Sequence, residues 1–131
     1  AIEGEAVFTH VIPAGPKIIA PKVDAEIDPA KPLVIKWEPV TKTIDGSDLK
    51  VVAYQVIVER TDNDELGAAP RTFDIKLPPS SGPNQTVTVP RQFLEKGIEY
   101  KFEILAIEEG GNQTITEGGP FTTKSAPIQA R

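Results

Sequence analysis

Few residues of this chain could do chemistry. His10 is the only histidine, and it lies in an N-terminal segment that stands apart from the patterned part of the sequence. A histidine-based triad would need His10 near a serine or threonine nucleophile and a carboxylate. The chain has no cysteine, which excludes disulfides, thiolate metal ligands and a cysteine nucleophile. We therefore interpret His10 as a surface or linker residue and expect no catalytic residue, no cofactor and no metal.

Two acidic segments could in principle bind a cation. The segment "TDNDELG" superficially resembles a calcium loop, but it lacks the glycine and glutamate spacing of an EF-hand and is flanked by strand patterns rather than helices. The segment "DGSD" is mainly a turn former, because aspartate and glycine favour turns. We interpret both as solvated loops, with a metal site as the alternative for the first; their acidic residues are Asp62, Asp64, Glu65, Asp45 and Asp48.

The charge balance argues against nucleic acid. The formal net charge is −5, from 14 basic and 19 acidic residues, and no Lys/Arg patch is interleaved with aromatic residues. The segment "GPKIIAP" lacks the Gly-x-x-x-x-Gly-Lys-Ser/Thr pattern of a phosphate loop. The longest apolar run is too short to span a bilayer. Binding to nucleic acid and insertion into a membrane are therefore not expected.

The tripeptide "NQT" occurs twice, at Asn84 and Asn112. Both positions lie in predicted loops and fit the Asn-x-Ser/Thr acceptor pattern for glycosylation. The pattern also arises by chance, so glycosylation of either asparagine stays conditional on a secreted, eukaryotic source.

Residues that would position any site lie on short strands. The 13 prolines and 10 glycines suit strands joined by turns. Period-two alternation recurs about every ten residues, which is typical of an all-β sandwich. Gly118 and Gly119 interrupt the last strand and predict a bulge or bend there. This alternation predicts seven strands.

The stretch Leu94-x-x-Gly97-x-x-Tyr100 precedes the best-patterned strand. In a tyrosine corner, a tyrosine near the start of strand F bonds a backbone group a few residues upstream. Gly97 would supply a backbone conformation that disfavours a Cβ, and Leu94 would plug the bottom of the core. We therefore predict that Leu94, Gly97 and Tyr100 fix the corner between two sheets.

With Trp37 in "VIKWEP", Tyr54 in "YQVIVE", the "PFTT" segment and the entry "GPKIIAP", this corner resembles a fibronectin type III domain. The resemblance covers about residues 16–124. It implies a seven-stranded immunoglobulin-like β-sandwich with sheets A-B-E and C′-C-F-G. On that template strand A lies near residues 22–28, B 33–39, C 51–60, C′ 71–77, E 85–90, F 98–108 and G 113–124. We expect residues 1–15 to form a linker or extra edge strand that partly docks, 16–125 the domain, and 126–131 a C-terminal tail.

The resemblance also implies that the B–C and F–G loops share one end of the sandwich. Asp45 and Asp48 would then face Glu108 and Glu109 across a weakly acidic tip. These four residues are the candidate contacts for a basic partner or a cation, and a merely soluble tip is the alternative.

The outward phase of strands C and F carries Ile57, Leu105 and Ile107. An exposed apolar strip there would mark a contact face. Alternatively, the N-terminal residues Val7 to Ile12 cover it. Both possibilities stay open.

Since no site chemistry emerges, we do not expect an enzyme. The expected function is that of a non-catalytic spacer or scaffold, a monomeric module within a larger secreted or cell-surface protein, extracellular or periplasmic. The alternative is a recognition module that binds a protein or a polysaccharide through its loops or its C-F-G sheet. Fold analogy alone does not choose between them.

Overall fold

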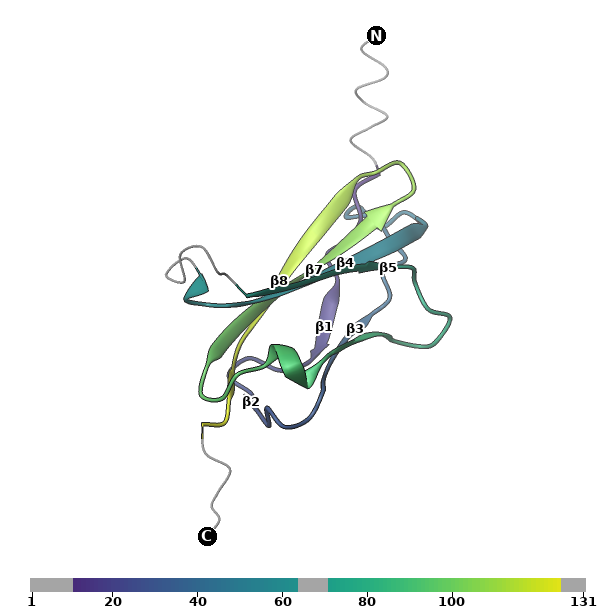
Figure 1. The fold of residues 1–131 in the computed structure, drawn as a ribbon. Coiled ribbons are helices and arrows are strands. Elements are labelled where there is room, and N and C mark those ends of the chain that lie inside the picture. The colour runs from purple at the N-terminus through teal and green to yellow at the C-terminus, as the bar shows by residue number, and fades with distance from the viewer. Residues whose placement is uncertain (1–10, 64–70, 126–131) are drawn as a thin grey trace.

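A computed structural model describes residues 11–63 and 71–125 of the chain. They form an all-β fold with two sheets, and a short 3-10 turn, η2 (Arg91–Phe93), precedes the last two strands (Figure 1). The all-β class expected from the sequence is confirmed. The strands are β1 (Lys17–Ala20), β2 (Glu26–Ile27), β3 (Leu33–Glu38), β4 (Val51–Arg60), β5 (Thr72–Leu77), β6 (Gln85–Val89), β7 (Glu99–Glu108) and β8 (Gln113–Thr123).

The two sheets differ in size. One has three strands in the order β1-β3-β6, and the other has five in the order β2-β8-β7-β4-β5. All pairs are antiparallel except β2 with β8, which run parallel. The alternating apolar residues of both sheets meet in one core, as the pattern predicts for a sandwich.

The prediction of seven strands is wrong, because the expected first strand at residues 22–28 is replaced by two short strands, and only Glu26–Ile27 of that range is a strand. In its place β1 pairs with β3 in the smaller sheet, and β2 pairs with β8 in the larger one. Residues between them turn: Asp24 adopts a left-handed φ of 64°, and the Ala25 N–H donates to the Lys22 carbonyl at 3.1 Å. Alternation along Lys22 to Ile27 therefore reflects a turn and a sheet change, so the described residues contain eight strands.

Large side chains fill the centre of the core. Trp37 and Tyr54 pack edge to face with ring centroids 5.3 Å apart, and Tyr100 stacks on Phe121 at 5.4 Å. Further core residues lie at alternate positions of β3, β4 and β7. They are Leu33, Ile35, Val56, Val58, Phe102, Ile104 and Ala106.

The glycine pair in β8 has a packing reason. The strand runs unbroken from Gln113 to Thr123, but its register with β7 shifts between Tyr100 and Phe102. A Cβ built on Gly118 would lie 2.3 Å from Cζ of the Phe102 ring, closer than real carbon contacts allow. The ring of Phe102 thus occupies the space that a side chain at Gly118 would need.

Candidate functional site

The corner predicted at Leu94, Gly97 and Tyr100 is built around one residue, Glu95. The Glu95 N–H donates to the Tyr100 hydroxyl at 2.8 Å, and the Thr123 hydroxyl donates to the Glu95 carbonyl. Gly97 has a left-handed φ of 67°, and its N–H donates to the Lys124 carbonyl at 3.3 Å. Leu94 is buried in the core. The corner therefore joins the start of β7 to the end of β8.

Charged side chains reinforce this corner from outside. The Arg60 guanidinium bonds both carboxylate oxygens of Asp62 at 2.7 Å and Oε1 of Glu95 at 2.6 Å. The pKa of Asp62 is lowered chiefly by the hydrogen bond from Arg60. Arg71 lies 3.6 Å from the same Glu95 oxygen and 6.0 Å above the ring of Phe93. Asp62, expected in a solvated loop, is thus a structural anchor, while Asp64 and Glu65 lie outside the described residues.

Sequence reasoning missed Glu95, Thr123 and Arg60 in this arrangement. Thr123 is 1 % exposed, and its hydroxyl also accepts the N–H of Ile98 at 3.0 Å. Its role depends on β8 returning to the corner, so the local sequence carries no signal for it.

The acidic tip holds fewer free carboxylates than expected. Asp48 forms an ion pair with Lys42, whose hydrogen bond lowers the pKa of Asp48. Asp45 accepts bonds from the Thr43 hydroxyl and, at 3.3 Å, from the Ser47 N–H. Both aspartates are exposed, but they mainly hold the β3–β4 loop, residues 39–50, in shape.

Glu108, one of the candidate partner contacts, is only 3 % exposed. Its carboxylate closes the β7–β8 turn, accepting the backbone N–H of Asn112 at 2.9 Å and the side-chain amide at 3.0 Å. The main cause that lowers the pKa of Glu108 is a hydrogen bond from the backbone N–H of Gly110 to its carboxylate. Of the two glutamates, only Glu109 is exposed. The tip is therefore a weak candidate for a cation site.

The described start of the chain docks beside this tip. The Ala14 N–H donates to the Lys42 carbonyl, and the Ile44 N–H donates to the Ile12 carbonyl, both at 2.9 Å. The Thr114 hydroxyl of β8 donates to the Pro13 carbonyl at 2.6 Å. Residues 11–16 thus tie the β3–β4 loop to β8. Val7 to His10 lie outside the described residues.

A second surface lies on the outer face of the five-stranded sheet, defined here as the side chains that point away from the three-stranded sheet. The continuous apolar strip considered for this face is absent: Leu105 is 6 % exposed, and Ile57 and Ile107 are half-buried. Ile115, opposite Leu105, is instead 51 % exposed. Since Ile12 bonds the β3–β4 loop, the described N-terminal residues do not cover this face.

A depression of about 130 Å³ lies on this face where β4, β7 and β8 meet. Glu103 and Glu117 are directly opposite each other across β7 and β8, and Ile57 is opposite Glu103 across β4. Like charges in opposed positions destabilise a sheet unless something compensates them. Lys101 lies 3.7 Å from Glu59 on the same face, so the depression keeps an excess of negative charge. We call this surface the acidic depression.

No metal ion is expected at either surface. The described residues contain no group of three or more histidine, cysteine, aspartate or glutamate side chains placed to hold one. They also contain no helix long and apolar enough to cross a bilayer. The two glycosylation patterns differ in context: Asn112 is committed to the β7–β8 turn, while the Asn84 carbonyl accepts the Ser80 hydroxyl at 3.4 Å.

Comparison with known proteins adds no identity: no protein-family model matches the chain, and no curated protein matches it significantly.

Proposed function

We propose that this chain is a fibronectin type III-like module that acts as a non-catalytic spacer or scaffold within a longer secreted or cell-surface protein. The strand orders β1-β3-β6 and β8-β7-β4-β5 support the family assignment, because they match the A-B-E and G-F-C-C′ orders that the family implies. The corner hydrogen bond from Glu95 to Tyr100 supports it as well. The parallel strand β2 is an addition to that pattern.

The observation that carries the spacer function is the path of the chain through the sandwich. Ile12 bonds the β3–β4 loop, whereas Lys124 bonds Gly97 at the corner. The register of β3 with β6 places Trp37 opposite Gln85 and Leu33 opposite Val89. The β3–β4 loop and the corner therefore lie at opposite ends of the sandwich (Figure 1). A chain that enters at one end and leaves at the other separates its neighbours by the module's length.

A domain swap in the parent protein tests this function. Residues 16–125 would be replaced by an unrelated β-sandwich whose chain also enters and leaves at opposite ends, and, in a control, by a flexible Gly/Ser linker. A spacer predicts that the parent keeps its activity with the foreign sandwich and loses part of it with the linker. Loss of activity with a correctly folded foreign sandwich would show that the surface of this module matters.

The acidic depression favours recognition of a basic protein segment as the second candidate function. Glu103 and Glu117 lie opposite each other, and neither forms an ion pair with a described residue. Ile57 beside them offers an apolar surface for the stem of a lysine or arginine. A polysaccharide fits less well, because Trp37 and Tyr54 are buried and cannot stack on sugars.

Titration of the isotope-labelled chain with a lysine-rich peptide at physiological salt tests this second function. We expect amide shifts concentrated at residues around Glu103 and Glu117, and their loss in the Glu103→Gln/Glu117→Gln double variant. The double variant Glu99→Gln/Glu109→Gln removes the same charge elsewhere and serves as the control. Shifts spread evenly over all acidic residues would exclude a specific site.

A further inference from the structure

Strand β5 forms one edge of the five-stranded sheet. Among the residues that the structure describes it pairs only with β4, so the other side of its backbone faces away from the sheet (Figure 1). Edge strands present backbone donors and acceptors that another strand can pair with. Four of its six residues are exposed, including Ile75 at 38 %. This edge is therefore a template for strand addition.

The sequence of β5 is complementary to itself. The side chains of Phe73, Ile75 and Leu77 point to the core side of the sheet. Those of Asp74 and Lys76, on either side of Ile75 in the sequence, point to its outer face. If two copies pair antiparallel with Ile75 opposite Ile75, each Asp74 lies opposite a Lys76. Each Phe73 then lies opposite a Leu77. Opposite charges and apolar pairs in these positions stabilise antiparallel strands.

Neighbouring symmetric registers lack this match. Centring the pair on Asp74 opposes two aspartates, and centring it on Lys76 opposes two lysines, which repel. A shift by a single residue would place side chains on the wrong face of the sheet. The charges of β5 therefore select one register with its own copy.

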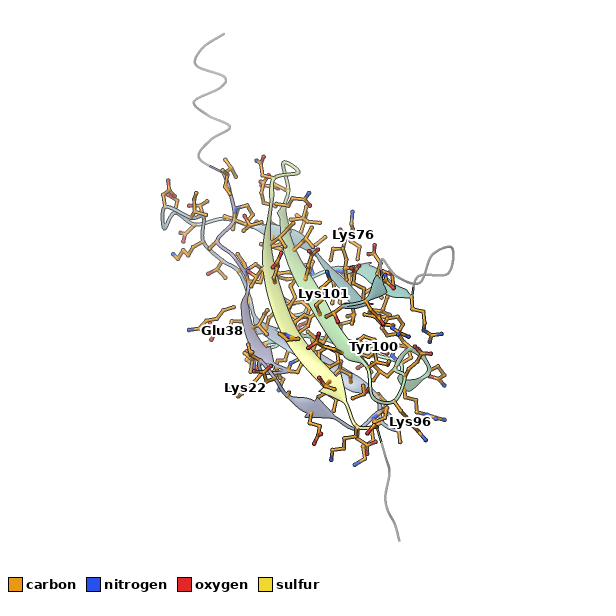
Figure 2. All side chains as sticks on the ribbon, turned by 90° about the vertical axis from the view of Figure 1, so that its left-hand side faces the viewer. Lys22, Glu38, Lys76, Lys96, Tyr100 and Lys101 are labelled. Atoms are coloured by element: carbon orange, nitrogen blue, oxygen red, sulfur yellow. The ribbon has the colours of Figure 1, made fainter. Side chains whose placement is uncertain are left out.

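We propose that two copies of this chain associate through β5, antiparallel and with the two-fold axis through Ile75, so that two five-stranded sheets become continuous. The occupant of the edge is a second copy because β5 itself supplies the lysine and aspartate that a partner strand would need. Asp74 accepts the Gln55 side-chain amide at 2.8 Å and keeps its second oxygen for Lys76 of the other copy. Lys76 reaches into solvent and makes no ion pair within the described ranges (Figure 2).

The association is weak, since the complementary segment is short and Pro78 and Pro79 follow it directly. It departs from the monomeric state expected from the sequence. It does not depend on the spacer function, because it uses only the side edge of the sheet.

Charge exchange tests the pairing in the full 131-residue chain by sedimentation equilibrium over a concentration series. The variants Asp74→Lys and Lys76→Asp each turn two attractive pairs into repulsive ones, so we expect dimer dissociation constants about tenfold or more higher. The double variant Asp74→Lys/Lys76→Asp restores both pairs and the original constant. Glu109→Lys and Lys96→Asp make the same charge changes at exposed turns and leave the constant unchanged. The proposal is overturned if the chain is a monomer at all concentrations. It is also overturned if the single charge exchanges leave the dimer dissociation constant unchanged, or if the double variant does not restore it.

Crosslinking tests the register independently, because the chain has no native cysteine. Residues opposite each other in an antiparallel pair have Cα atoms about 4.5–5.5 Å apart, within reach of a disulfide. Ile75→Cys should therefore give a covalent dimer under mild oxidation. Thr72→Cys should not, since the two sulfurs would be about 20 Å apart in this register. The axis at Ile75 is contradicted if Ile75→Cys gives no crosslink. It is also contradicted if both variants crosslink equally, or if only Thr72→Cys gives a covalent dimer.

Discussion

The hydroxyl of Tyr54 accepts a hydrogen bond from the backbone N–H of Val40 at 2.8 Å, although the two residues are 14 positions apart. Val40 follows the end of β3, and Tyr54 lies in β4 with its ring against Trp37. Burial raises the pKa of Tyr54, so the hydroxyl stays protonated at neutral pH. This bond does at the β3–β4 end what the Tyr100 bond does at the corner: it holds the chain where it leaves one sheet for the other.

Replacement of Tyr54 by phenylalanine should therefore destabilise the fold by about 1–3 kcal/mol, because the buried N–H of Val40 loses its partner. Urea unfolding followed by tryptophan fluorescence measures this through Trp37. Thr88→Val removes a hydroxyl from an exposed position in β6 and should change stability little. If Tyr54→Phe and Thr88→Val unfold at the same urea concentration, the bond contributes nothing to stability.

Tyr100→Phe should lower the free energy of unfolding by about 1–3 kcal/mol, because a backbone N–H loses its acceptor. It should also change hydrogen exchange locally. The Glu95 N–H would lose its acceptor, so its hydrogen exchange should accelerate more than that of the Leu94 N–H, which donates to the Arg91 carbonyl. Amide exchange measured by NMR, together with urea unfolding, separates local from global effects. An unchanged unfolding midpoint would mean that Leu94, Gly97 and Tyr100 do not lock the corner.

The sequence predicts the residues of this corner but not its full set of bonds. Leu94, Gly97 and Tyr100 are close in the chain, so their spacing carries the motif. Thr123 lies 28 positions from Glu95 and reaches it only after β8 has paired with β7. Contacts of this kind depend on tertiary packing, for which a local pattern has no signal.

The same limit explains the error at the first strand. Alternation along Lys22 to Ile27 predicts a strand, but it does not report which sheet supplies the partner, and Val23 at one of the apolar positions is 68 % exposed. Glu108 shows the converse case, because a charged residue next to glycines predicts a solvent-exposed turn. Its carboxylate is instead occupied by the N–H groups of the turn itself.

Gly118→Ala should destabilise the chain by about 1–3 kcal/mol, because a methyl group there forces the Phe102 ring out of its position. Gly82→Ala is the matched control, since the added Cβ would lie 3.7 Å from the Asn84 carbonyl oxygen, an ordinary contact. Thermal unfolding of both variants measures the difference. The double variant Gly118→Ala/Phe102→Leu should lose less than the sum of its single changes, since the shorter side chain makes room. Strict additivity would contradict the clash.

Glu108→Gln should destabilise the folded chain by about 1–3 kcal/mol at neutral pH, because a neutral amide replaces a carboxylate that accepts several N–H bonds. The pKa of Glu108 is lowered in the folded state from an ordinary value of 4.5, so its stabilising contribution is complete above that pH. It is lost as the pH falls through the folded-state pKa, where Glu108 itself becomes neutral. The difference in unfolding free energy between wild type and variant should thus be constant from about pH 7 down to pH 5 and shrink in more acidic solution. Glu109→Gln removes the same charge at the exposed neighbouring position and should change the unfolding free energy little at neutral pH. A difference for Glu108→Gln that persists unchanged in acid would show that its charge does not hold the turn.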